Sequence, residues 1–254
     1  MKRDSSARPL ISIVIPAYNE EKRLARTIRE TMAWSRNNLE DCEILVVDDG
    51  SSDQTLAIAR SFLNEDVCLR ALACPHRGKG GAVRSGMLAA EGRYVLFMDA
   101  DGATPLSETD RLLAALQNGY DVAVGSRVTN DADTIVKSSV ARKGVRQAFI
   151  SLVHLLASSG VRDTQCGFKM FRREVVRPIF SRQSVDGFAF DVEILLIARK
   201  LRLSIAEVGV NWTAQPGSTV NLLTDSFRML RDIIRIRWVH RNTRSAGQVE
   251  LETE

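Results

Sequence analysis

Short apolar runs alternate, along the first half of the chain, with longer segments whose apolar residues recur at helical spacing. The apolar runs are predicted strands, at residues 10–15, 43–47, 67–73, 93–98 and 121–124. The segments between them are predicted helices, at residues 20–34, 81–90 and 107–117, with a further helix start at 51–53. Strands that alternate with helices favour βαβ units. We therefore expect an α/β fold whose mainly parallel sheet is flanked by helices.

Beyond residue 127 the alternation becomes less regular. The pattern there predicts helices at residues 137–159 and 188–201, and strands at 168–171 and 205–210. The last residues, 243–254, lack apolar periodicity and are predicted to form a mobile tail. We expect a single domain made of two halves, residues 10–127 and 128–240, the second with a helical C-terminal extension.

Composition and charge narrow the class of protein without choosing a function. The 254 residues are 44% hydrophobic and 26% charged, which is typical of a globular protein with a sizeable core. The net charge of +4 permits an anionic partner, but no basic and aromatic surface is evident that would favour nucleic acid. The four cysteines include no CxxC pair, so we expect reduced thiols and no zinc site.

The chain shows no targeting or membrane-spanning pattern. Residues 1–8 are polar and charged, unlike the apolar stretch of a signal peptide. No run approaches the roughly 18 apolar residues that a spanning helix needs. We expect a cytoplasmic protein that is either soluble or peripheral on the cytoplasmic face of the membrane.

Two predicted strands end in pairs of carboxylates. Asp99 and Asp101 follow the apolar run 94–98, and Asp48 and Asp49 follow the run 44–47. Carboxylates two residues apart can give a hard cation such as Mg²⁺ or Mn²⁺ two oxygen ligands, while a diphosphate completes its coordination. Acids that only cap the next helix are the alternative. Because parallel strands deliver their carboxyl ends to one sheet edge, two acidic ends favour a nucleotide and metal site.

Two further turns add candidate nucleotide contacts. Pro16 is expected to end the first strand, after which Tyr18 offers a flat face for a base and Glu20 an acceptor for ribose; a plain turn is the alternative. The glycine-rich run 78–81 carries Lys79 into a helix, where backbone N–H groups can approach an anion. It is neither a Walker A loop nor a dinucleotide fingerprint, and a flexible loop is the alternative.

Three charged residues in the later part of the chain each have two interpretations. Arg127 closes a predicted strand, where it can clamp a phosphate or pair with an aspartate. Asp163 lies in the dense polar run 162–169, which is unusual for a plain loop. Asp191 lies in a predicted helix among apolar neighbours, so a buried, paired acid is the alternative to a functional one.

Residues 227–238 predict a basic amphipathic helix. One side carries the apolar residues Phe227, Leu230, Ile234 and Trp238. Another side carries the arginines Arg228, Arg231 and Arg235. Such a helix suits an anionic membrane surface, or it packs on the core with a solvated basic face.

In this order, the motifs resemble those of family 2 glycosyltransferases. More narrowly, the chain is similar over about residues 10–240 to polyprenyl- and dolichyl-phosphate β-glucosyltransferases, which are related to dolichyl-phosphate mannose synthases. The motifs are VIPAYNEE at 14–21, LVVDDGSSDQT at 45–55, GKGGAVRSGM at 78–87, MDADGAT at 98–104, GSR at 125–127, SVARKGVR at 139–146, RDTQCGFKMF at 162–171, FAFDVEIL at 188–195 and EVGVNWT at 207–213.

The resemblance implies a glycosyltransferase-A type fold and an inverting, metal-dependent transfer of a sugar. The donor would be UDP-glucose, held by the first half, and the acceptor a polyprenyl or dolichyl monophosphate, held by the second. It assigns the nucleotide to Pro16, Tyr18, Glu20, Asp48, Asp49, Lys79, Ala100 and Arg127. It assigns the metal, Mg²⁺ or Mn²⁺, to Asp99 and Asp101, and the acceptor phosphate to Arg142. Asp163 or Asp191 would act if a proton must move.

Other activities stay open at this point. A GDP-mannose-dependent mannosyltransferase is one, although the mannose synthases place a metal-binding glutamine where this chain has Ala103. A nucleotide-sugar-binding module without turnover is another, and the intact set of Lys79, Asp99, Asp101 and Arg127 argues against it. An oxidoreductase is disfavoured because no G-x-G-x-x-G follows the first strand.

Overall fold

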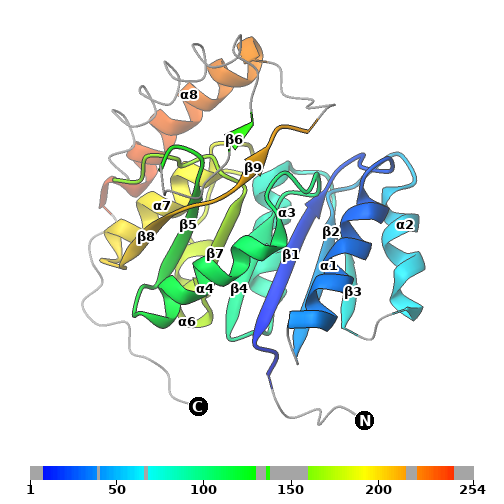
Figure 1. Ribbon diagram of the computed structural model, residues 1–254. Helices are drawn as coiled ribbons and strands as arrows, with labels where there is room; N and C mark the ends of the chain where they lie inside the picture. Colours follow the sequence, from blue (N-terminus) through cyan, green and yellow to red (C-terminus); the bar gives the residue numbers. More distant parts are fainter. Residues whose placement is uncertain are drawn as a thin grey trace.

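A computed structural model describes residues 8–38, 41–65, 68–129, 136–137, 160–215 and 222–242. Its centre is a seven-stranded sheet in the order β3-β2-β1-β4-β7-β5-β8 (Figure 1). The strands are β1 (Ile11–Ala17), β2 (Cys42–Asp48), β3 (Leu69–Ala73), β4 (Tyr94–Met98), β5 (Val122–Ser126), β7 (Phe168–Arg172) and β8 (Ile205–Gly209). Two short strands, β6 (Val136–Lys137) and β9 (Trp212–Thr213), pair in parallel beside it.

The sheet is mainly parallel, as predicted, with one exception. Strand β7 runs antiparallel between β4 and β5 and joins the two halves of the chain into one sheet. Its register sets Lys169 opposite Phe97 on β4 and Val124 on β5. Strand β1 continues through Pro16 to Ala17, so the prediction that Pro16 ends the strand is wrong. Pro16 is accommodated inside β1, opposite Val47 of β2.

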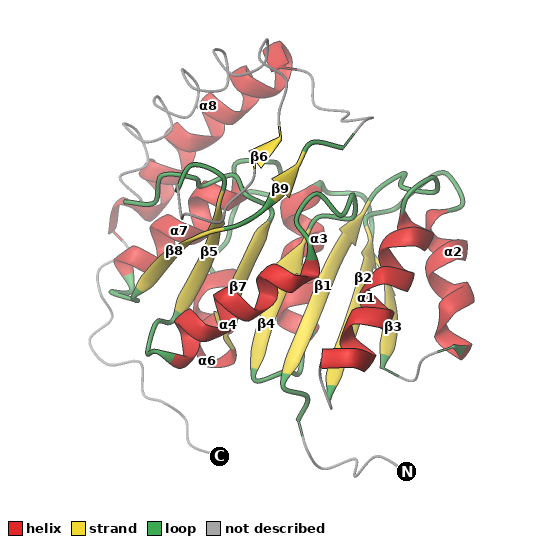
Figure 2. Ribbon diagram, viewed as in Figure 1, coloured by secondary structure: helices red, strands yellow, loops and turns green. Residues whose placement is uncertain are grey.

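Helices cover both faces of the sheet (Figure 2). They are α1 (Leu24–Asn38), α2 (Thr55–Ser61), α3 (Lys79–Ala89), α4 (Thr109–Gln117), α6 (Arg173–Phe180), α7 (Phe190–Lys200) and α8 (Leu222–Val239). Short 3-10 turns follow or precede them: η1 (Phe62–Asn64), η2 (Leu106–Glu108) and η4 (His240–Asn242).

The sheet separates two hydrophobic clusters. Residues of α1, α2 and α4 pack on one face, together with Ile13 and Ile15 of β1. Residues of α3, α6 and α7 pack on the other face, together with Val14 of the same strand. Strands covered on both faces are expected to be apolar at every position. This explains why the strand sequences read as continuous apolar runs without a polar side.

Helix α8 packs on α7 through a side that the sequence pattern did not single out. Met229, Ile233 and Ile236 are buried in a third cluster with Ala189 and Val192. The side chains of Ile234 and Trp238, on the apolar side expected from the sequence, are 59% and 65% exposed. The helix therefore has a core-facing side and a second, exposed apolar side.

Two predictions fall beyond the described ranges. Residues 138–159, most of a predicted helix that includes Arg142, lie outside them, as does the tail at 243–254. Lys137, the first residue of that predicted helix, belongs to β6. Within the described residues, none of the helices combines the length and apolar character that crossing a membrane requires.

Candidate nucleotide and metal site

The carboxyl ends of β1, β2 and β4 meet at one edge of the sheet, and the predicted acidic residues gather there. Asp99 directly follows β4, and its N–H donates to the carbonyl of Gly167 at 3.1 Å. Lys79, the first residue of α3, places its ammonium nitrogen 2.5 Å from Oδ1 of Asp99. The fold thus brings the glycine-rich loop against the first aspartate of the pair.

The carboxylates at this edge repel one another. Burial raises the pKa of Asp101 above its ordinary value, and the neighbouring charge of Asp99 adds to the shift. The pKa of Glu20 is also raised, mainly by burial and further by Asp101 and Asp99, although Arg23 opposes it. Arg23 grips Glu20 with Nε and Nη2, at 2.7 and 2.8 Å. The site therefore gathers three carboxylates, of Glu20, Asp99 and Asp101, beside two cationic side chains, Arg23 and Lys79.

This donor set fits a divalent cation that arrives with a diphosphate. Within the described ranges, no three His, Cys, Asp or Glu residues converge in a way that would hold a metal alone. Asp99 and Asp101 offer two carboxylates, and Mg²⁺ or Mn²⁺ is commonly held by one or two carboxylates plus phosphate oxygens. A bound cation would also relieve the repulsion that raises the pKa of Asp101.

Gly167 is a residue that the sequence analysis passed over. A Cβ atom at this position would overlap the carboxylate of Asp99. Because only a glycine leaves room there, the backbone of the segment before β7 lies directly against the side chain of Asp99. The sequence alone does not reveal that the glycine of the run RDTQCGFK lies against Asp99.

A stacked aromatic pair lies beside the ends of β1 and β2. The rings of Tyr18 and His76 are 4.1 Å apart, with 21° between their planes. His76 Nδ1 lies 2.9 Å from Oδ2 of Asp49, whose carboxylate also accepts the N–H groups of Arg77 and Gly78 at 2.9 and 2.8 Å. Asp49 thus anchors the loop before α3. His76 is a further residue that the sequence analysis missed.

The other predicted nucleotide contacts are buried in the same region. Asp48, at the end of β2, accepts the N–H of Ser51 at 3.3 Å through Oδ2. Its Oδ1 is buried and has no hydrogen-bond partner among the described residues. The carbonyl of Ala100 accepts the hydroxyl of Thr27 at 2.6 Å, which ties the loop after β4 to α1.

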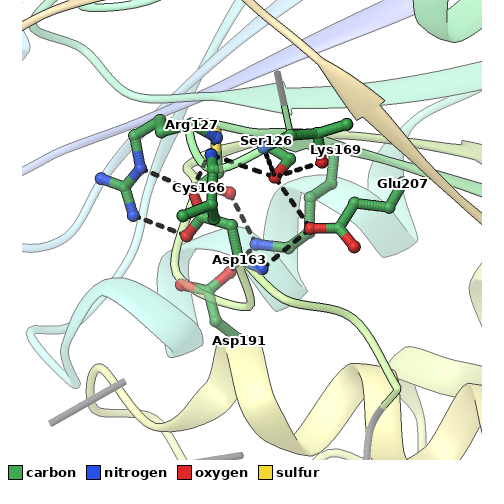
Figure 3. A network of polar contacts seen from close by, with 9 residues as sticks. Ser126, Arg127, Asp163, Cys166, Lys169, Asp191 and Glu207 are labelled. Atoms are coloured by element: carbon green, nitrogen blue, oxygen red, sulfur yellow. Dashed lines mark hydrogen bonds and ion pairs between the residues drawn. The ribbon is translucent and has the colours of Figure 1, made fainter. Parts of the chain in front are cut away.

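Arg127 pairs with Asp163 (Figure 3). Its Nε and Nη2 donate to the two carboxylate oxygens at 2.7 and 2.8 Å, and its backbone N–H donates at 2.9 Å. Burial opposes ionisation of Asp163, but the guanidinium holds its pKa below the ordinary value. Of the two interpretations of Arg127, the structure has the aspartate pair. An ionised and fully paired Asp163 is a weak base, which disfavours it as a proton acceptor.

Glu207 on β8 completes this cluster and was not predicted. Its Oε1 accepts the hydroxyl of Ser126 at 2.8 Å and the N–H of Asp163 at 3.0 Å. Its Oε2 accepts the N–H of Arg162 at 3.0 Å. The guanidinium of Arg127 also lies 5.3 Å over the ring of Trp212. These contacts hold Arg127 and Asp163 in place at the ends of β5 and β8.

A second buried ion pair lies beneath the edge (Figure 3). Lys169 of β7 donates to Asp191 of α7 at 2.5 Å and to the carbonyl of Cys166 at 2.6 Å. Burial raises the pKa of Asp191, against the attraction of Lys169 and Lys79. Burial also raises the pKa of Cys166 to about 12, so its thiol stays protonated. Asp191 therefore has the contacts of a buried, paired acid.

Comparison with known proteins places these observations in a family. The sequence profile described as Glycosyl transferase family 2 matches residues 12–180. The dolichyl-phosphate beta-glucosyltransferase of Dictyostelium discoideum is 39% identical over 241 residues, which cover 90% of this chain and 74% of that protein. The dolichyl-phosphate beta-glucosyltransferase of Homo sapiens is 38% identical, with 92% and 76% covered.

A solved structure has the same fold. It is glucosyl-3-phosphoglycerate synthase from Mycobacterium tuberculosis in complex with Mn²⁺, uridine diphosphate and glucosyl-3-phosphoglycerate. Its TM-score is 0.67 at 19% sequence identity, and the match covers 90% of this chain and 80% of that chain. At this identity the likeness establishes the fold, which is of the glycosyltransferase-A type.

Proposed function

Because the chain belongs to glycosyltransferase family 2, we propose that it transfers glucose from UDP-glucose to the monophosphate of a polyprenyl or dolichyl lipid. The names of the relatives support the glucosyl group and the dolichyl-phosphate acceptor. The observation that carries the proposal is the crowding of Asp99, Asp101 and Glu20 beside Lys79 at the sheet edge. Such an excess of carboxylates attracts a divalent metal ion, and the metal ion in turn binds a diphosphate.

The proposed chemistry needs no strong base from the protein. The phosphate of the acceptor is an anion at neutral pH, so its oxygen can attack the anomeric carbon while the bond to the UDP oxygen breaks. Attack from the opposite side inverts the configuration and gives a β-linked product. The ion pairs of Asp163 and Asp191 agree with a mechanism in which neither removes a proton.

The chain's own residues would bind and orient the donor. Asp99 and Asp101 would hold Mg²⁺ or Mn²⁺, which neutralises the leaving diphosphate and acts as a Lewis acid. Lys79 lies near enough to Asp99 to meet a phosphate oxygen at the same place. The exposed ring of Tyr18 and its neighbour His76 offer an aromatic surface for the base.

We also propose that α8 contacts an anionic lipid surface. Ile234, Trp238 and Val239 are exposed apolar residues at its end. They are interspersed with exposed arginines, Arg231, Arg235, Arg237 and Arg241. An apolar strip beside basic side chains is the pattern of a helix that lies in a membrane interface. A lipid-phosphate acceptor would be reached from that surface.

Titration calorimetry tests the donor assignment. UDP-glucose, UDP and GDP-mannose are titrated into the protein with and without Mn²⁺ or Mg²⁺, and UDP-glucose is then assayed for transfer to a polyprenyl phosphate. We expect metal-dependent binding of the uridine ligands and formation of a glucosyl lipid. Preference for GDP-mannose would favour the mannosyl alternative. Binding without turnover on any polyprenyl phosphate would favour a binding module.

Flotation with anionic vesicles tests the surface. Replacing Ile234 and Trp238 by Ser is expected to weaken partitioning at least about tenfold, because two apolar side chains are lost from the interface. Leu88→Ser is the matched control, since Leu88 is an exposed apolar residue on α3. Equal partitioning of the double variant and the control would exclude this face of α8 as the contact.

A further inference from the structure

Glu193 on α7 is buried and highly coordinated, although no role in donor binding falls to it. Its Oε1 accepts the N–H and hydroxyl of Ser184 at 2.9 and 2.6 Å, and its Oε2 accepts the N–H of Val185 at 2.8 Å. His240, just after α8, places Nε2 at 2.7 Å from Oε1. Burial opposes ionisation, but these bonds hold the pKa of Glu193 below its ordinary value.

The segment that Glu193 fixes also grips the glycine-rich loop. The carbonyl of Asp186 accepts the N–H groups of Gly80 and Gly81 at 2.8 and 3.3 Å. Gln183 donates from Nε2 to the carbonyl of Gly80 at 2.9 Å. A Cβ at Gly80 would lie 2.9 Å from the carbonyl oxygen of Val185, so the glycine-rich run and the segment are in close contact. The 183–186 segment therefore holds the first turn of α3.

Lys79 lies directly before the two glycines that this segment holds, as the first residue of α3. Its ammonium reaches Asp99 at 2.5 Å, so a shift of the loop would move the ammonium relative to the carboxylates. A continuous series of contacts thus runs from His240, through Glu193 and the 183–186 segment, to Lys79. Figure 1 shows α8 lying beyond α7 from the sheet, so the series joins α8 to the edge of the sheet that carries Asp99.

We propose that Glu193 is a positioning residue that holds Lys79 in place for the donor diphosphate, and that His240 makes this hold depend on the docking of the C-terminal end of α8, where His240 lies. The proposal rests on the proposed function, because it assumes that Lys79 meets the donor. Coupling between two sites is reciprocal. Donor binding should therefore strengthen the docking of α8 by the same factor by which docked α8 strengthens donor binding.

Hydrogen exchange tests the positioning without any activity. In Glu193→Gln the amide nitrogen faces the donors of Ser184 and His240, and in His240→Leu one donor is lost. We expect the backbone amides of residues 80–82 to exchange about tenfold faster in both variants, the size expected for losing a hydrogen bond to a charged group. His240→Gln should restore the protection, because its amide can donate to Glu193.

A control separates this path from general loosening of α8. Met229→Ala removes a buried contact between α8 and α7, about 16 Å along the helix from His240. It should speed exchange in α8 and leave residues 80–82 unchanged. Unchanged exchange at 80–82 in both His240→Leu and Glu193→Gln would overturn the proposal. If Glu193→Gln does not fold, the pair His240→Leu and His240→Gln decides alone.

Donor binding provides the second readout. In His240→Leu we expect the KM for UDP-glucose to rise about tenfold while the KM for the lipid phosphate stays unchanged. In the wild type, UDP with Mn²⁺ should slow exchange in α8. If the wild-type protein neither binds UDP nor transfers glucose, the proposed function is wrong. The hydrogen-exchange experiment on residues 80–82 still tests whether His240 and Glu193 hold the first turn of α3. If the wild-type protein transfers glucose but UDP leaves α8 exchange unchanged, the coupling fails alone.

Discussion

Two charged clusters share the same edge of the sheet and differ in how completely the protein satisfies them. In the cluster of Arg127, Asp163 and Glu207, every carboxylate oxygen accepts a hydrogen bond from the protein. In the cluster of Glu20, Asp99 and Asp101, like charges lie close together in a partly buried place. The first cluster has the properties of a scaffold, and the second those of a binding site that a ligand completes.

The pKa shifts express the same difference. The pKa of Asp163 is lowered, so its charge stabilises the folded state. The pKa of Asp101 is raised, so its charge destabilises the folded state. Acids whose pKa is raised in the folded state often mark functional sites, because a bound ligand can offset the cost of keeping them charged. Substitutions in the two clusters should therefore affect activity and stability in opposite ways.

The largest expected effect is on activity, in Asp101→Asn. The side chain keeps an oxygen for the N–H of Ala103 but loses the charge that a metal requires. We expect transfer to fall more than about a thousandfold and metal-dependent UDP binding to disappear. The thermal midpoint should stay equal or rise. Asp110→Asn, which changes an exposed acid of α4, is the control. A similar loss of transfer activity in the control would show that the effect is not specific to the cluster of Glu20, Asp99 and Asp101.

The next largest effect is on stability, in Asp163→Asn. The variant leaves the largely buried guanidinium of Arg127 without its ionic partner. Breaking a buried ion pair in this way is expected to lower the free energy of unfolding by about 3 kcal/mol, a factor of roughly 150 in the folding equilibrium. Urea unfolding measures it. A loss no larger than in Asp110→Asn would show that the cluster is not a scaffold.

Gly167→Ala tests whether the position of the Asp99 carboxylate, rather than its charge, matters for activity. The added methyl group would displace the carboxylate of Asp99 without removing any charge. A displacement of about 1 Å at a reacting centre can lower the rate about a hundredfold, and we expect a loss of this size. Gly187→Ala is the control, because its nearest neighbour would be Asp232 at 3.7 Å. Steady-state transfer rates decide, and equal rates in both variants would contradict the prediction.

The sequence predicted most of the sheet because the strands are apolar at most of their positions. The direction of β7 was not predictable, since the run 168–171 has the same pattern of apolar residues for a parallel and an antiparallel strand. The position of β7 between β4 and β5 sets Lys169 opposite Phe97 and Val124, where its ammonium meets Asp191. A lysine with no exposed surface in a central strand depends on a partner from a distant helix, which no local pattern reveals.

The residues that gather at this edge of the sheet were predicted more completely than the contacts that support them. Asp99, Asp101 and Lys79 were found because their residue types follow strand ends and a glycine-rich turn. The anchoring of the loop by Asp49 depends on backbone N–H groups, which carry no sequence signature. The same holds for the core-facing side of α8, because that helix is apolar on two sides and the sequence cannot tell which one packs.

The smallest expected effect is a difference in pH dependence between the two aspartates. The pKa of Asp163 lies below its ordinary 3.8, so its stabilising contribution is complete above that value and is lost as the pH falls through the lowered pKa. The pKa of Asp101 lies above 3.8, so the folded state takes up its proton first and the destabilisation disappears as the pH falls toward 3.8.

Urea unfolding from pH 3 to 7 compares each Asn variant with the wild type. The deficit of Asp163→Asn should shrink at the acid end, below the ordinary pKa. Any gain of Asp101→Asn should be largest near pH 7 and should shrink as the pH falls through the raised pKa toward 3.8. Two differences that vanish over the same pH interval would contradict the assignment of one cluster to scaffold and the other to binding.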